Sequence, residues 1–213
     1  MFNNSETEQQ VAEFLLQIKA IKLQPNNPFT WASGWKSPIY CDNRITLSHP
    51  TIRTYIRQQL TEIITEKFGA VGCIAGVATA GIPQGTLVAQ ELGLPFIYVR
   101  AKAKEHGTGS LIEGDILTGK RVVVIEDLIS TGKSSLQAVN ALRDAGYDVA
   151  GLAAIFTYGF DVATENFAKA NCPFVTLSNY GALIKYAEEN QYILPKDAEV
   201  LREWRQSPSI WGQ

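Results

Sequence analysis

The chain has 213 residues, which is enough for one medium-sized domain with a full hydrophobic core. Its hydrophobic fraction of 46% is ordinary for a globular protein, and a formal net charge of −2 gives no electrostatic reason to expect nucleic-acid binding. No apolar stretch is long enough for a membrane span, and the first residues lack the basic and apolar regions of a secretory signal. Three cysteines lie far apart without metal-ligand spacing, so we expect reduced thiols in a cytoplasmic protein.

Hydrophobic periodicity predicts an alternation of helices and strands along most of the chain. The first helix is expected over residues 7–20 and the second over residues 51–68. Between them, residues 25–44 are rich in aromatic, glycine and polar residues and are predicted to form a loop, which we call the hood segment. Because no linker, repeat or low-complexity tract divides the chain, a single domain is expected over residues 1–213.

Short apolar runs predict the strands of a central sheet. They cover residues 71–77, 95–99, 122–125, 148–157 and 174–177. Helices are expected to end at Gly93 and to cover residues 163–170 and 181–189. Residues 112–117 and 120–125 are expected to pair around Thr118 and Gly119. The tail, residues 198–213, carries Trp204 and Trp211 and is expected to pack as a helix and terminal staple or to serve a subunit interface.

The most informative stretch is residues 122–135, which read VVVIEDLISTGKSS. A buried strand is followed by two carboxylates, Glu126 and Asp127, by a polar turn and by a helical pattern, as in a βαβ unit. Backbone N–H groups at a helix start, with Ser and Thr hydroxyls beside them, suit a phosphate dianion. A carboxylate pair accepts hydrogen bonds from vicinal hydroxyls or holds a hydrated divalent cation. Together these groups describe a site for a phosphorylated ribose.

Two other interpretations of this stretch are weaker. Gly132-Lys133-Ser134 matches the end of the nucleotide-triphosphatase P-loop, but the first glycine of that motif would fall at Asp127, whose negative charge would repel the phosphates. A buried strand with a polar turn would account for residues 122–125 but not for adjacent acids followed by Ser-Thr-Gly-Lys-Ser.

Two more segments carry groups that suit a pyrophosphate. Residues 78–81 form a small-residue loop between a strand and a helix, which is equally consistent with phosphate binding and with a tight turn. After the strand at residues 95–99, four cationic or ionisable side chains alternate with other residues, so an extended backbone would place all four on one face. They are Arg100, Lys102, Lys104 and His106. A solvated charged face is the alternative, but the small alanines between them and the glycines that follow are typical of a mobile lid.

These motifs resemble those of a known family. The stretch at residues 122–135 resembles the phosphoribosyl-pyrophosphate (PRPP) signature of type I phosphoribosyltransferases. The hood segment is similar to the F-T-x-x-S-G-x-K-S-P-x-Y-x-D-x-R pattern of the orotate phosphoribosyltransferases, and R-x-K-x-K-x-H-G resembles their catalytic loop. Some members carry a lysine where this chain has Ala32, Ala80 or Ala101, and an arginine near the position of Tyr158.

The resemblance implies the type I phosphoribosyltransferase fold, an α/β fold with a mainly parallel central sheet of about five strands flanked by helices. A small hood and a flexible lid loop at about residues 101–114 would complete it. The implied reaction transfers the phosphoribosyl group from PRPP to orotate in pyrimidine synthesis, with Mg²⁺ as cofactor but no protein metal site. Another base, or a non-catalytic PRPP-sensing regulator, is the alternative. A homodimer is implied, in which Arg100 and the lid act in the partner's site.

The same resemblance assigns the site residues. The catalytic residues would be Lys104, His106 and Asp127. Orotate would contact Ser130 and Lys36. PRPP would be bound by Arg100, Lys104, His106, Glu126, Asp127, Leu128, Ile129, Ser130, Thr131, Gly132, Lys133 and Ser134.

Overall fold

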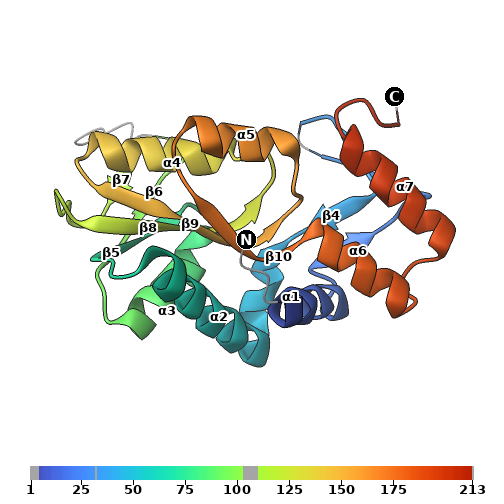
Figure 1. Ribbon diagram of the computed structural model, residues 1–213, viewed down its shortest axis with the longest axis horizontal. Coiled ribbons are helices and arrows are strands. Elements are labelled where there is room, and N and C mark those ends of the chain that lie inside the picture. Colours follow the sequence, from blue (N-terminus) through green and yellow to red (C-terminus); the bar gives the residue numbers. More distant parts are fainter. Residues whose placement is uncertain (1–4, 32, 103–109, 213) are drawn as a thin grey trace. The chain divides into compact units, whose positions relative to one another are not determined.

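The computed structural model describes residues 5–31, 33–102 and 110–212 (Figure 1). They form two compact units, each of which is described on its own. The smaller unit combines residues 1–52 with residues 178–213, and the larger unit comprises residues 53–177.

The larger unit is built on a six-stranded sheet with the order β10-β9-β8-β5-β6-β7. Its strands are β5 (Cys73–Val77), β6 (Phe96–Val99), β7 (Ile112–Glu113), β8 (Arg121–Ile129), β9 (Asp148–Thr157) and β10 (Phe174–Asn179), of which the last two residues of β10 belong to the smaller unit. Strand β5 pairs in parallel with β6 and β8, and β8 pairs in parallel with β9. The predicted mainly parallel sheet is therefore confirmed, with one strand more than expected.

Helices cover both faces of this sheet. Figure 1 shows α4 (Lys133–Asp144) and α5 (Asp161–Lys169) on one face and α2 (Pro50–Phe68) and α3 (Gly81–Leu92) on the other. All five residues of β5 are buried, as a central strand covered on both faces requires. This explains why unbroken apolar runs, rather than alternating patterns, marked the strands in the sequence.

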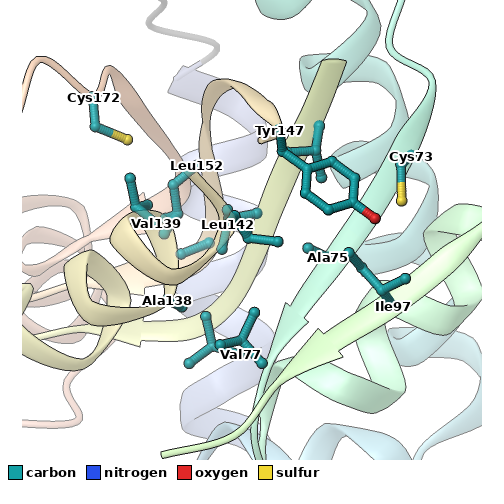
Figure 2. Packing of buried hydrophobic residues seen from close by; sticks show 14 of the residues in the cluster. Cys73, Ala75, Val77, Ile97, Ala138, Val139, Leu142, Tyr147, Leu152 and Cys172 are labelled. Atoms are coloured by element: carbon teal, nitrogen blue, oxygen red, sulfur yellow. The ribbon is translucent and has the colours of Figure 1, made fainter. Parts of the chain in front are cut away.

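The core between the sheet and α4 joins side chains from several strands to one helix face (Figure 2). Ala138, Val139 and Leu142 of α4 pack there against Leu152 of β9 and Val77 of β5. Their spacing of one, three and four residues places them on one side of the helix. This packing fixes the start of α4 relative to the ends of the central strands, where the site residues lie.

One predicted strand pairing is wrong. Residues 112–117 were expected to pair with residues 120–125, but β7 is antiparallel to β6, with Val99 opposite Ile112. Over residues 122–125 both edges of β8 are occupied, by β5 and by β9, so no edge is left there for β7. Residues 117–120 do form a turn, in which the Lys120 N–H donates to the Leu117 carbonyl.

Over its described residues, the smaller unit contains three helices and two short antiparallel strand pairs. The helices are α1 (Ser5–Gln17), α6 (Tyr180–Glu189) and α7 (Pro195–Gln206), and a 3-10 helix covers Asn43–Ser48. Strand β1 (Ile21–Leu23) pairs with β4 (Ile39–Cys41), and β2 (Phe29–Thr30) pairs with β3 (Lys36–Ser37). The hood segment thus contains the β2–β3 hairpin and β4 between turns, and these strands were not predicted because strands of two or three residues are too short to show periodicity. None of the described helices is long and apolar enough to cross a membrane.

Candidate active site

The strand that carries the two carboxylates extends further than the sequence predicted. Strand β8 was expected to end at Ile125 but continues to Ile129, because its pairing with β9 goes on after its pairing with β5 has stopped. Residues 122–125 therefore have a strand on both sides, whereas residues 126–129 pair with β9 alone. We call residues 126–129 the β8 extension. It presents its free edge at the carboxyl ends of the parallel strands, where ligands of open α/β sheets bind.

Glu126 and Asp127 have different surroundings on the β8 extension. The Glu126 side chain is buried, and its Oε1 accepts the Asp127 N–H at 3.1 Å while its Oε2 accepts the Ser135 hydroxyl at 3.3 Å. Burial raises the pKa of the Glu126 carboxyl well above its ordinary value of 4.5, and the neighbouring charge of Asp127 raises this pKa further. Asp127 is only half-buried. Asp127 is therefore the better placed of the two to accept hydrogen bonds from a ligand.

The turn after β8 leads directly into α4. Gly132 adopts a positive φ of 78° at the N-cap, and a Cβ there would lie 2.7 Å from the Phe167 ring, so both backbone and space require glycine. The Thr131 carbonyl accepts a hydrogen bond from Asn166 Nδ2 at 3.0 Å. Asn166 and Phe167 belong to α5, which thus supports the turn from behind. The result is a fixed helix N-terminus whose first N–H groups have no partner within the helix, the arrangement that binds phosphates.

The other residues assigned to PRPP on this segment divide into two groups. Leu128, Ser130 and Thr131 are partly exposed, and Lys133 and Ser134 are exposed at the helix start. The Ile129 side chain is fully buried in the core, and its carbonyl accepts from the Thr157 hydroxyl at 3.2 Å and from the Tyr158 N–H at 3.2 Å. Ile129 therefore turns its carbonyl towards β9 and its side chain into the core, and it serves to hold the end of β8 in place.

A second loop, residues 78–81, lies against the β8 extension. A Cβ on Gly81 would come within 2.3 Å of the Ile125 carbonyl oxygen, so only glycine fits. At the other end of the loop, the Ala78 N–H donates to the Val99 carbonyl at 2.9 Å. The Ala78–Thr79 peptide bond is cis. The two small-residue loops that the sequence singled out are thus neighbours at one edge of the sheet.

Arg100 follows β6 directly and so begins next to the loop at residues 78–81. Its N–H donates to the Leu111 carbonyl at 2.8 Å, and its guanidinium pairs with Glu113 of β7 at 3.1 Å. These contacts close the base of the segment that was predicted to be a lid. The other two assigned residues of that segment, Lys104 and His106, lie outside the described residues, as does Ala32 of the hood segment.

Lys36, the residue assigned to orotate, belongs to the smaller unit. It pairs with Thr30 across the β2–β3 hairpin, and its Nζ donates to the Thr30 hydroxyl at 2.9 Å. Tyr158, which stands near the position of an arginine in some relatives, is buried between the rings of Phe156 and Phe160. The larger unit therefore brings together residues 126–134, the loop at residues 78–81 and Arg100.

Three residues that support the site were not predicted. They are Ser135, which donates to Glu126, and Asn166 and Phe167, which hold the turn around Thr131 and Gly132. Asn166 and Thr131 are 35 residues apart, and no local pattern connects them. Only the packing of α5 beside the start of α4 makes their contact apparent.

The described residues contain no group of three or more His, Cys, Asp or Glu side chains that could hold a metal ion. The donor set nevertheless fits Mg²⁺, which usually keeps several waters and takes one or two carboxylates together with substrate phosphates. Asp127 is the protein carboxylate suited to that role, because it is half-buried whereas Glu126 is buried.

Comparisons with known proteins agree with this geometry. The family described as "Phosphoribosyl transferase domain" matches residues 47–188. Orotate phosphoribosyltransferase of Phocaeicola vulgatus is 58% identical over 204 residues, which is 96% of each chain. The chain belongs to the orotate phosphoribosyltransferase family. Within this family, the enzyme of Listeria innocua is 55% identical over 206 residues, covering 97% of this chain and 99% of its own.

Solved structures show the same fold. Orotate phosphoribosyltransferase of Aeropyrum pernix superposes with a TM-score of 0.75 at 29% identity, over 86% of this chain and 99% of that one. UMP synthase of Leishmania donovani superposes with a TM-score of 0.78 at 25% identity, over 93% of this chain and 42% of that longer one. The fold and the family implied by the sequence motifs are therefore confirmed.

Proposed function

We propose that the protein transfers the 5-phosphoribosyl group from PRPP to orotate, giving orotidine 5′-phosphate and pyrophosphate in pyrimidine synthesis. The observation that carries the proposal is the edge at which the β8 extension, the start of α4 and the loop at residues 78–81 meet. It offers a carboxylate for ribose hydroxyls between two groups of backbone N–H donors, as a ribose with phosphates at C5′ and C1′ requires. Membership of the orotate phosphoribosyltransferase family supports orotate as the acceptor.

The reaction exchanges two bonds at C1′ of the ribose. The bond between C1′ and the pyrophosphate oxygen breaks, and its electron pair leaves with the pyrophosphate. Orotate N1 gives up its proton and forms the new bond to C1′. While the old bond breaks, C1′ becomes oxocarbenium-like and negative charge develops on the leaving group, so fixed hydrogen-bond acceptors at the sugar and cations at the pyrophosphate lower the barrier.

Each part of the site takes one of these tasks. Asp127 holds the ribose hydroxyls, and Glu126 orients Asp127 and the α4 start through its contacts with the Asp127 N–H and Ser135. Residues 130–134 bind the 5′-phosphate, with Ser130 also beside orotate. Arg100, Lys104 and His106 of one subunit serve the pyrophosphate that leaves in the partner's site. When bound, Mg²⁺ would neutralise part of the pyrophosphate charge, with Asp127 as the nearest protein carboxylate.

The active form would be a homodimer, in which Arg100 and the lid loop complete the partner's site.

We also propose a cytoplasmic location. Its support is that Cys41, Cys73 and Cys172 are all free thiols, as expected in a reducing compartment.

The test is an absorbance assay for loss of orotate with PRPP and Mg²⁺. Orotate is expected to disappear only when PRPP is present, and much more slowly when Mg²⁺ is removed by a chelator. Parallel reactions contain uracil, hypoxanthine or adenine in place of orotate. Faster use of one of these bases would overturn orotate as the substrate, and PRPP binding without consumption of any base would indicate a regulator instead.

A further inference from the structure

The C-terminal helix of the smaller unit makes a direct contact with the hairpin that carries Lys36. Trp204 of α7 is completely buried, and its indole N–H donates to the Lys36 carbonyl at 3.1 Å. The two residues are 168 positions apart in the sequence. The C-terminal helix therefore fixes the backbone of β3 at the residue whose side chain is assigned to orotate.

Ring contacts extend this attachment to the turn of the hairpin. Trp204 meets Trp31 edge-on, with ring centroids 5.5 Å apart, and Trp31 stacks on Trp35 at 6.4 Å. The Trp31 indole N–H donates to the Ile39 carbonyl at 3.1 Å, which ties the same ring to β4. Edge-on and offset aromatic pairs each contribute beyond the area they bury. Trp204 thus supports the hairpin through both a hydrogen bond and a ring.

Gly212, near the end of the chain, also lies close to Lys36. Gly212 lies so close that a Cβ there would be 3.3 Å from Lys36 Cβ and 3.7 Å from its Cγ. Lys36 is thus held at two points, its carbonyl by Trp204 and its ammonium by the Thr30 hydroxyl, and Gly212 lies near the base of its side chain.

The hairpin needs such support because it is very short. Strands β2 and β3 have two residues each, and an isolated two-stranded hairpin is at best marginally stable in water. We propose that Trp204 is a positioning residue for orotate, which acts by holding the Lys36 hairpin through the C-terminal helix. This inference rests on the proposed function, because it takes the role of Lys36 in orotate binding from there.

The test compares the variant Trp204→Phe with the wild type in steady-state kinetics. Phenylalanine keeps an aromatic ring but removes the N–H donor to Lys36. A lost hydrogen bond of typical net strength is expected to raise the KM for orotate about two- to tenfold. The KM for PRPP and the kcat are expected to stay within about a factor of two, because the residues assigned to PRPP belong to the larger unit.

Tyr180→Phe is the matched control. The Tyr180 ring lies 5.6 Å from that of Trp204, and its hydroxyl donates to the Leu201 carbonyl of α7 at 2.8 Å. This variant loses one buried hydrogen bond from the same cluster without touching the hairpin. It is expected to lower the Tm while leaving the KM for orotate unchanged. The comparison therefore distinguishes an effect of α7 stability from an effect of the position of Lys36 on orotate binding.

Lys36→Ala and the double variant Lys36→Ala/Trp204→Phe complete the experiment. If Trp204 acts through Lys36, the double variant has the same KM for orotate as Lys36→Ala alone. A contrary result is that Lys36→Ala raises the KM for orotate only, while Trp204→Phe raises the KM of both substrates or of neither. That result would overturn the positioning role of Trp204 and leave the assignment of Lys36 in place. An unchanged KM for orotate in Lys36→Ala would overturn that assignment, and the present inference with it.

Discussion

Glu126 and Asp127 are adjacent carboxylates whose surroundings separate their tasks. Asp127 is half-buried on the β8 extension, whereas Glu126 is buried and accepts hydrogen bonds from the Asp127 N–H and Ser135. Asp127→Asn keeps the size of the side chain and removes its charge. We expect the fold to remain and kcat/KM to fall by on the order of 10²-fold or more, as when a preorganised electrostatic contact is lost. Steady-state kinetics on a variant with wild-type circular dichroism measure this, and unchanged kcat/KM would remove Asp127 from the ribose contact.

Glu126 makes the stability of the protein depend on pH. Its folded-state pKa is raised above 4.5, so between these two values the folded protein holds a proton that the unfolded chain has lost. The stability is therefore expected to decrease as the pH rises from the ordinary pKa through the raised one. Glu126→Gln removes this titration, so the Tm of the variant is expected to rise relative to the wild-type Tm as the pH increases across this range. A Tm difference that stays constant with pH would show that Glu126 is not the group responsible.

At the scale of single residues, the sequence predicted groups with local signatures and missed those defined by packing. The acid pair and the small residues after it stand next to each other in the chain, so their chemistry could be recognised in order. The different roles of Glu126 and Asp127 could not be recognised, because they depend on the hydrogen bond from Ser135, at the start of α4, to Glu126. The role of Trp204 was equally hidden, since its partner is 168 residues away.

At the scale of elements, α5 supports the turn that is proposed to bind the 5′-phosphate. Asn166 donates to the Thr131 carbonyl from the outside of the turn. Asn166→Ala is expected to raise the KM for PRPP about two- to tenfold, as one lost hydrogen bond implies, while leaving the KM for orotate close to that of the wild type. The matched control is Glu165→Ala on the same helix, whose carboxylate pairs with Lys169 at the surface. If both variants behave alike, α5 does not position the turn.

Helices and strands were predicted correctly where their burial produces a hydrophobic pattern in the sequence. Strand β9 matches its predicted residues, and Gly93 ends α3 in the left-handed conformation, as a C-cap glycine should. Helix α1 ends three residues earlier than predicted, at Gln17. The missed strands have two causes. The pairing of β7 with β6 depends on which strand edges are free, and the strands of the hood segment are too short to show a pattern in local hydrophobicity.

At the scale of the whole molecule, the proposed dimer places the lid of one subunit over the site of the other. Arg100 starts beside its own β6, and an extended span of about ten residues reaches roughly 33 Å, enough to cross an interface. Mixing Lys104→Ala subunits with Asp127→Asn subunits tests this. Random exchange would make about half of the dimers mixed, each with one intact site, so about a quarter of the wild-type activity should return.

The control for this experiment is each variant measured alone at the same total concentration. Activity of the exchanged mixture equal to the sum of the two parents would mean that the lid acts within its own subunit.

The sequence supported the family and the order of its motifs, because these are properties of the whole chain. It gave no sign of the two compact units, which are defined by contacts between its ends rather than by any linker.

The unequal pairing of β8 also sets how its amides exchange with deuterated solvent. Residues 122–125 are flanked by β5 and β9, so their exchange requires the centre of the sheet to open. Residues 126–129 have only β9 beside them and should exchange earlier through smaller openings. A phosphorylated ribose bound at that edge would slow exchange in residues 126–129 and leave residues 122–125 unchanged. Mass spectrometry of the corresponding peptides, with and without PRPP, would then show the position of the ligand on a single strand.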